Sequence, residues 1–188
     1  ALHFTGEPEA DALLASDPLA LTIGFVLDQQ VTVQKAFSSP LELSRRLGGL
    51  DAGRIAAMEP EELERVFREK PALHRFPGAM AARVREHCAV IASEYDGDPR
   101  NVWRDAGDPQ ELRRRLEALP GFGEMKVKAL AAVLAKRFGV EVAAELAPAH
   151  PTLGDVDSPE ALARYQSQKR AHKAAMRSGA DTRGWQSS

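Results

Sequence analysis

The sequence predicts an all-α fold for this chain of 188 residues. Four helices are expected to start at an aspartate or serine followed by proline, because such a pair supplies a capping oxygen and a residue suited to the first helical position. Gly48 and Gly139 stand where C-terminal caps are expected. No stretch keeps the period of two that a half-buried strand requires. The four start signals are Asp17-Pro18, Ser39-Pro40, Asp108-Pro109 and Ser158-Pro159.

The first long helix is expected at 18–37. Its residues are apolar on nearly all sides from Leu19 to Leu27, and the chain then turns polar at Asp28-Gln29-Gln30. A helix with this pattern is buried at first and reaches the surface at its glutamines. The apolar run is too short to span a bilayer and lacks the flanks of a signal peptide, so neither a membrane segment nor a targeting segment is expected.

Seven further helices are expected between the remaining start and stop signals. Glu42 and Glu111 occupy the capping-box position after two of the starts. The segment 140–156 has weak periodicity and is expected to be irregular. The residues after Arg177 are small and polar and are expected to be flexible. The seven helices are expected at 40–47, 51–57, 60–69, 78–95, 109–118, 123–138 and 159–176.

Composition and charge indicate an ordinary globular protein of a reducing cytoplasm. Apolar residues make up 44% and charged residues 28%, and the net charge of −2 means that any nucleic-acid site must gather its positive charge locally. Cys88 is the only cysteine, which excludes an intramolecular disulfide and a four-thiolate iron–sulfur cluster. Cations gather in the last third, as one basic face or as a solvated helix surface: Lys126, Lys128, Lys136, Arg137, Arg164, Lys169, Arg170, Lys173 and Arg177.

The most informative motif is the turn Leu119-Pro120-Gly121-Phe122-Gly123, which joins two helix-like runs. Pro120 stops the first run, and both glycines allow positive φ and close backbone approach. The next helix begins with unbonded N–H groups at the positive end of its dipole, and these groups can hold a phosphate, with Lys126 and Lys128 adding charge. The alternative is a tight corner that binds nothing. The agreement of the glycines with the lysines favours the phosphate site.

This hairpin, together with the segment 27–36 (Leu-Asp-Gln-Gln-Val-Thr-Val-Gln-Lys-Ala), resembles the helix-hairpin-helix DNA glycosylase superfamily. The superfamily includes endonuclease III, adenine glycosylase and alkyladenine glycosylases. The similarity spans residues 18–140 in order and spacing and continues more weakly at 155–176. Polymerases, ligases and nuclease subunits also carry the hairpin, and the buried helix that ends in Gln-Gln narrows the choice.

The resemblance implies two helical lobes with the active cleft between them. Residues 20–118 would form a helical-barrel lobe. Residues 1–19 and 119–176 would form the second lobe, which carries the hairpin, and residues 177–188 would form a flexible tail.

The resemblance also implies how the protein contacts DNA. Amides near Gly121, Gly123 and Lys126 would hold a phosphate beside the lesion. Gln29 or Gln30 would fill the gap left when the target nucleotide is rotated out of the duplex; the alternative for both is a solvated helix end. No cofactor is required and no iron–sulfur cluster is implied. A structural sodium or potassium ion would be coordinated by the main-chain carbonyls of Glu117, Leu119 and Phe122.

The family places its catalytic aspartate at the start of the helix that follows the hairpin, in a sequence similar to Val156-Asp157-Ser158. Asp157 would guide a water and stabilise the sugar cation. Asp155 is the second candidate. The alternative is that Asp157 only caps the following helix, since Asp157-Ser158-Pro159-Glu160 is itself a capping box.

Three features depart from the family pattern. Met125 stands where bifunctional members carry a Schiff-base lysine, and Lys126 lies about 100° further around the helix, which disfavours an imine-forming lyase. The distance from Met125 to Asp157 is longer than in the family, which implies an insertion within 140–154. Glu124 places a negative charge near the presumed phosphate.

The remaining motifs are less informative. The segment 74–78 (His-Arg-Phe-Pro-Gly) is either a second, degenerate hairpin or a turn, with a turn slightly favoured. The five histidines have no metal-ligand spacing, so no zinc site is inferred.

The sequence thus predicts a monomeric, cytoplasmic, monofunctional DNA glycosylase of base excision repair. Its partner would be double-stranded DNA that contains a damaged or mismatched base, and no membrane. The rival hypothesis is a non-catalytic DNA-binding protein that kept the hairpin and lost the aspartate. No residue pattern encodes which base is removed.

Overall fold

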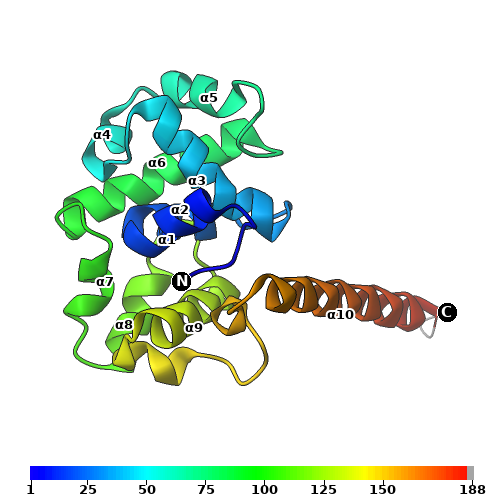
Figure 1. Ribbon diagram of the computed structural model, residues 1–188. Helices are drawn as coiled ribbons and strands as arrows, with labels where there is room; N and C mark the ends of the chain where they lie inside the picture. The colour runs from blue at the N-terminus through cyan, green and yellow to red at the C-terminus, as the bar shows by residue number, and fades with distance from the viewer. Residues whose placement is uncertain (186–188) are drawn as a thin grey trace.

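A computed structural model describes the backbone of residues 1–185 and the side chains of residues 1–178. Every regular element within residues 1–185 is a helix, which confirms the predicted all-α class. In Figure 1, α2 lies in the middle of the body, with α3 to α6 above it and α7 to α9 below it. The elements are α1 (Pro8–Ser16), α2 (Pro18–Leu27), α3 (Val33–Leu47), α4 (Ala52–Ala57), α5 (Pro60–Arg68), α6 (Pro77–Glu94), α7 (Arg100–Arg104), α8 (Pro109–Glu117), α9 (Glu124–Phe138), the short 3₁₀ helices η1 (Glu141–Leu146) and η2 (Leu153–Asp155), and α10 (Pro159–Trp185).

Three of the four proline start signals open helices as predicted. The Asp17 carboxylate accepts a hydrogen bond from the Leu19 amide at 2.9 Å, and the Asp108 carboxylate accepts one from the Glu111 amide at 2.8 Å. At α10 the capping oxygen belongs to Ser158, whose hydroxyl accepts from the Ala161 amide at 3.1 Å. Local caps of this kind need only residues a few positions apart, which is why the sequence predicts them well.

The fourth start signal, at Ser39-Pro40, is wrong, and so is the long helix at 18–37. α2 ends at Leu27, and α3 begins at Val33 under a Thr32 cap and continues through Pro40. The Ser39 hydroxyl donates to the carbonyls of Lys35 and Leu73 instead of capping a new helix. Because Pro40 has no N–H, α3 lacks one backbone hydrogen bond there. The free energy gained by burying the apolar face of α3 outweighs the loss of that hydrogen bond.

The segment 140–156 is more regular than predicted, because it forms η1 and η2. The Thr152 hydroxyl caps η2, and the Asp155 carboxylate returns to the Thr152 amide as a capping box. A Cβ on Gly154 would lie 2.7 Å from the Ala132 carbonyl oxygen, so η2 packs directly on the backbone of α9. The segment 140–156 therefore covers one face of α9.

α10 also differs from its prediction. It continues to Trp185, past the expected end at 176, so residues 177–185 of the predicted flexible tail are helical. Residues 186–188 of that tail lie outside the described residues.

The core is built around α2, because every residue from Leu19 to Leu27 is buried. α2 packs against α1, α3 and α6. The rings of Phe25 and Phe37 meet edge to face with centroids 5.1 Å apart, and Phe4 adds a second edge contact to Phe37 at 5.2 Å. A Cβ on Gly24 would overlap the Phe37 ring, so the close approach of α2 and α3 depends on that glycine.

The buried hydrophobic residues form one continuous core that extends from Leu2 to Leu162. No gap between separate cores therefore marks the predicted lobe boundary at 118–119, and the division into two lobes stays a prediction. Among the described residues, no single helix is both long and apolar enough to cross a membrane; α1 and α2 meet that test only as a pair bent by 113°.

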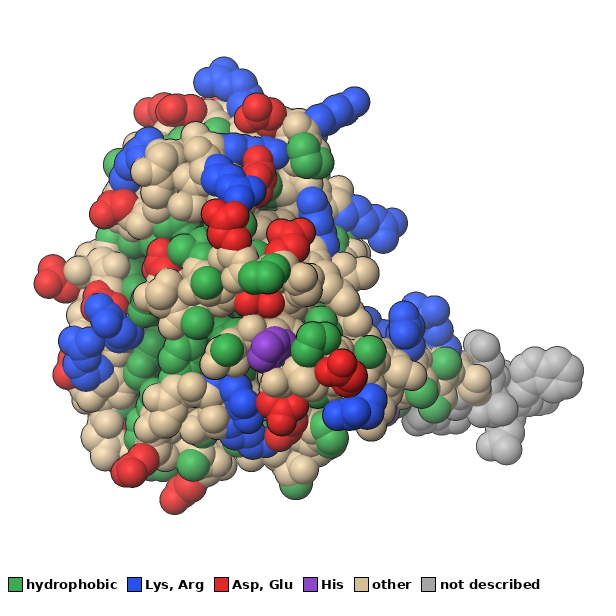
Figure 2. All heavy atoms as spheres, in the orientation of Figure 1, with side chains coloured by type: hydrophobic (Ala, Val, Ile, Leu, Met, Phe, Trp, Pro, Cys, Tyr) green, Lys and Arg blue, Asp and Glu red, His purple; other side chains and the backbone are tan. Residues whose placement is uncertain are grey.

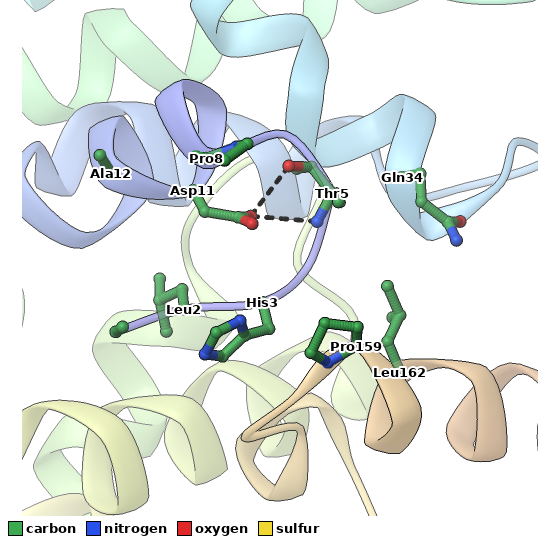
Figure 3. Close-up of a pocket in the computed structure, with 11 residues that line it drawn as sticks. Leu2, His3, Thr5, Pro8, Asp11, Ala12, Gln34, Pro159 and Leu162 are labelled. Carbon is green, nitrogen blue, oxygen red and sulfur yellow. Dashed lines mark hydrogen bonds between the residues drawn. The ribbon is translucent and has the colours of Figure 1, made fainter.

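The N-terminal segment forms a loop from Leu2 to Pro8, and Asp11 fixes this loop (Figure 3). One oxygen of the Asp11 carboxylate accepts from the amides of Phe4 and Thr5, at 3.1 and 3.0 Å, and from the Thr5 hydroxyl at 2.9 Å. Between this segment and the first turns of α10 lies a cavity of about 530 Å³, with Pro159 and Leu162 on its lower side. Asp11 is thus part of the packing of the N-terminal segment.

Candidate functional site

The predicted wedge residues lie in the turn between α2 and α3, residues 28–32, called the glutamine turn below. The side-chain amide of Gln29 folds back and donates to the Val26 carbonyl at 3.0 Å. Gln30 is exposed and has φ +57°, a left-handed conformation that is uncommon for a residue other than glycine. The two glutamines therefore differ: Gln29 closes the end of α2, and Gln30 projects from the turn.

His74 holds the glutamine turn from the other side. Its Nε2 donates to the carbonyls of Leu27 and Gln29, at 3.1 and 3.0 Å, while Nδ1 accepts from the Phe76 amide at 3.0 Å. This arrangement requires the neutral ring with the proton on Nε2. Burial lowers the pKa of His74, which favours the same form. The segment 74–78 is thus a turn that leads into α6.

A cavity of about 450 Å³ separates the glutamine turn from α10. One wall is formed by residues 28–33, and the opposite wall by Gln166 and three cations, Lys169, Arg170 and Lys173. Gln166 and Gln34 exchange side-chain hydrogen bonds and so connect α10 to α3 beside the cavity. The volume lies within the range typical of small-molecule pockets.

Asp28 is the carboxylate of this cavity, and the sequence analysis did not propose it. Burial raises the pKa of the Asp28 carboxyl, and the nearby charges of Lys169, Lys126 and Lys173 lower it by less. Burial and the charge of Asp28 together raise the pKa of Tyr165, on α10, to about 12. One signal could have found Asp28, because an acid at the C-terminal end of an apolar helix is opposed by the helix dipole and needs another reason to be there.

The two glycines of the hairpin turn, residues 118–123, have different backbone conformations. Gly121 has φ +85° and lies near the side chains of Val26 and Arg83. Gly123 has φ −84° with extended ψ, and a Cβ there would meet nothing within 4 Å, so the backbone at this position does not use the positive φ that a glycine allows. Gly123 is the N-cap of α9 and provides no side-chain cap to the amides of the first turn.

Phe122 anchors the hairpin turn, since only 5% of it is exposed and its ring stacks on His87 of α6 with centroids 6.0 Å apart. The carbonyl of Leu119, one of three predicted cation ligands with Glu117 and Phe122, accepts a hydrogen bond from the Phe122 amide at 3.1 Å. The described residues contain no group of three or more His, Cys, Asp or Glu side chains that could hold a metal ion. The main-chain cation site stays a prediction.

The two lysines near the start of α9 have different surroundings. The Lys126 amine donates to the Val26 carbonyl at 3.1 Å, and burial lowers its pKa to about 8. The Lys128 amine lies 3.1 Å from the Glu124 carboxylate on the helix surface. The positive charge of Lys128 and the negative charge of Glu124 are therefore paired with each other. The Val26 carbonyl accepts from both Gln29 and Lys126, and it therefore joins the glutamine turn to the helix that follows the hairpin turn.

The two predicted catalytic aspartates lie elsewhere. Asp155 lies 2.6 Å from the Lys136 amine and accepts a hydrogen bond from the Thr152 amide at 2.7 Å. Burial raises the pKa of the Asp155 carboxyl, but these two partners lower it by more, so the net shift is downward. Asp157 is exposed, and Ser158 next to it performs the capping role that was the alternative for Asp157. Neither aspartate lines the cavity at the glutamine turn.

Cys88 and His87 are buried residues of α6. Burial and the charge of Asp51 raise the pKa of the Cys88 thiol to about 12, which makes it unreactive. His87 Nε2 lies 2.8 Å from the Thr22 hydroxyl, which itself donates to the Leu19 carbonyl, so Nε2 carries the proton. Within the described residues His87 Nδ1 has no hydrogen-bond partner, which fits a neutral ring.

Acid should destabilise the protein through His87. Burial lowers the pKa of His87 to about 4, whereas the unfolded chain takes up this proton near the ordinary value of about 6.5. The unfolded state therefore binds more protons between these values, and stability should fall on the order of 3 kcal/mol as the pH drops through this window. Urea unfolding followed from pH 7.5 to 4.5 should show a smaller decline for His87→Leu than for the unchanged chain. Replacing the exposed His150 with glutamine is the control, and an unaltered decline in His87→Leu would contradict this role.

The chain has no significant match among protein-family models, curated proteins or solved structures.

Proposed function

We propose that this protein is a DNA glycosylase of base excision repair, which extrudes one damaged or mispaired nucleotide from duplex DNA and hydrolyses its N-glycosidic bond. The observation that carries the proposal is the cavity of about 450 Å³, which brings Asp28, Gln29 and Gln30 opposite Lys169 and Lys173 of α10. A carboxylate, an exposed amide and several cations in one cavity suit an extruded nucleotide, whose base, sugar and phosphate make different demands.

The hairpin turn would grip the backbone beside this cavity. The first amides of α9 have no capping side chain, and a phosphate at a helix N-terminus accepts from such amides. Lys126 ties α9 to the carbonyl of Val26, two residues before Asp28, so a phosphate held at the hairpin turn would lie near the cavity. Gln30 would enter the duplex in place of the extruded nucleotide, because it is the exposed glutamine of the pair.

Asp28 would have the catalytic role that the sequence predicts for Asp157 or Asp155. Glycosidic bond cleavage leaves a cationic sugar, which an adjacent carboxylate stabilises, and the same carboxylate can orient the attacking water. Lys126, Lys169 and Lys173 lower the pKa of Asp28 and so help to keep it ionised at neutral pH.

The reaction would be monofunctional. Met125, at the position of the family's Schiff-base lysine, cannot form an imine, and 85% of it is exposed. The amine of Lys126 is engaged with the Val26 carbonyl. Borohydride should therefore not trap a covalent protein–DNA adduct.

The rival is a DNA-binding protein without catalytic activity. It is favoured by the positions of Asp155, which is paired with Lys136, and of Asp157, which is exposed. It would use the hairpin turn and the cations of α10 to bind duplex DNA and would leave every lesion intact.

A panel of end-labelled duplexes distinguishes the two functions. Each duplex carries one lesion: uracil, hypoxanthine, an alkylated purine, an oxidised purine or a mismatched adenine. Strand breakage after protein and then alkali, on at least one duplex, is the expected result. Breakage without alkali would replace the monofunctional mechanism with a lyase. Intact strands on every duplex, with retention in a gel shift, would overturn the glycosylase and favour the rival.

A further inference from the structure

α10 carries a row of positive charges away from the body. In Figure 1 this helix leaves the body near α9 and continues well beyond the other helices, and Figure 2 shows Lys and Arg side chains on its described part. The sequence has no aspartate or glutamate between Ala161 and Ala180. Its contacts with the body are concentrated at its start, where it packs on η2.

Four cations of α10 share one side, called the cationic stripe below. At about 100° per residue, Lys169, Arg170, Lys173 and Arg177 fall within an arc of about 100°. The first three line the cavity at the glutamine turn, and Arg177 extends the row outward. At about 1.5 Å per residue the stripe is about 12 Å long.

Repulsion within the cationic stripe lowers the stability of α10 as a helix. Lys169 and Lys173 are four residues apart, as are Lys173 and Arg177, and like charges at this spacing destabilise a helix. Within the described side chains, none of the four cations forms an ion pair with a carboxylate. A polyanion laid along the stripe would remove this repulsion.

The composition of α10 favours a nucleic acid over other polyanionic or apolar partners. Most exposed residues between the cations are small or polar, for example Ala171, Ala174 and Ala175, and the single large apolar side chain among them is that of Met176. A helix that inserts into a membrane surface or packs on a partner helix needs a continuous apolar face, which this part of α10 lacks. Each strand of a duplex carries one charge per about 3.4 Å of the axis, so about 12 Å presents roughly three to four phosphates of one strand to the four cations.

We infer that the cationic stripe of α10 binds the phosphodiester backbone of duplex DNA from the cavity outward, as a second contact with the backbone in addition to the hairpin turn. The inference rests on the proposed function for the direction of the DNA, because the strand that delivers a nucleotide to the cavity must leave it alongside Lys173 and Arg177. This contact is independent of sequence and of damage, since phosphates carry no base information.

The test compares two variants of the full chain. Lys173→Gln combined with Arg177→Gln removes two charges from the stripe. Arg164→Gln removes one exposed cation that points almost opposite to the stripe, which makes it the matched control. Fluorescence anisotropy of a labelled, undamaged duplex is measured over a series of KCl concentrations. The slope of log K against log[KCl] should become shallower by about 1.8 in the double variant, at about 0.9 per lost phosphate contact, and should stay unchanged in Arg164→Gln.

Two outcomes would overturn the inference: an unchanged slope in the double variant, or an equal loss in Arg164→Gln, which would indicate only general attraction. Binding to phosphatidylserine vesicles that depends on the stripe, with an unaltered DNA slope, would assign the stripe to a membrane instead. The lesion panel separates this test from the proposed function. If a lesion duplex is cleaved and the double variant has an unchanged slope, the glycosylase proposal stands and the stripe does not bind DNA. If the slope is shallower and no duplex is cleaved, the stripe binds DNA and the glycosylase proposal is wrong.

Discussion

Asparagine in place of Asp28 is expected to reduce base release by about 10²- to 10⁴-fold, the range that a positioned acid or base usually contributes. The amide keeps the size of the side chain and loses the charge that would stabilise the sugar cation. Duplex affinity should change little, because the positive groups around Asp28 remain. Single-turnover assays on the lesion duplex that is cleaved, with gel shifts on the same duplex, measure both quantities.

Asp155→Asn and Asp157→Asn are the matched controls for Asp28→Asn. Both should retain nearly full turnover, although Asp155→Asn loses the ion pair with Lys136 and should be somewhat less stable. If Asp157→Asn abolishes turnover and Asp28→Asn does not, the assignment returns to the aspartate that the sequence favoured. Equal turnover in all three variants would leave the proposed reaction without its carboxylate.

The pH profile gives an independent check on Asp28. Burial raises its pKa, so turnover by the unchanged chain should begin to fall at a higher pH than the ordinary aspartate pKa would predict. The charged form is the active one, and its population declines as the pH drops through the raised pKa. An acid limb at the ordinary aspartate pKa would contradict the assignment of the reaction to Asp28.

Alanine at Gly121 is expected to weaken duplex binding by about tenfold, and alanine at Gly123 should have almost no effect. Gly121 has φ +85°, where a Cβ costs roughly 1 to 2 kcal/mol, while its neighbours, the side chains of Val26 and Arg83, lie at ordinary contact distances. The hairpin turn must therefore change shape or bear this cost, and its amides no longer meet the phosphate correctly. Gel shifts on undamaged duplex measure the affinity.

The comparison of Gly121→Ala with Gly123→Ala separates the effect of backbone conformation from that of adding a Cβ. Thermal unfolding of both variants shows whether Gly121→Ala acts on the turn alone or on the whole fold. An equal loss of affinity in Gly123→Ala, whose φ is −84°, would mean that backbone conformation is not the cause. Undiminished binding by Gly121→Ala would exclude the hairpin turn as the phosphate grip.

Part of the candidate site could be predicted from the sequence. The sequence predicts that the glutamine turn and the hairpin turn contact DNA, and in the structure the Val26 carbonyl joins the glutamine turn to the helix that follows the hairpin turn. Asp28 was missed although it precedes Gln29, because the carboxylate was sought at the position that the family resemblance indicated. Asp155 was placed in the site, and its capture by Lys136 could not be foreseen from residues 19 positions apart in sequence.

The sequence by itself determined the all-α class, the starts of α2, α8 and α10, and the hairpin turn around Gly121, because caps and turns depend on residues only a few positions apart. Only the tertiary structure decided that α3 continues through Pro40, that Lys126 reaches the end of α2, and that Asp28 faces α10. These outcomes depend on which apolar faces bury one another, and contacts between residues about 100 positions apart leave no local pattern in the chain.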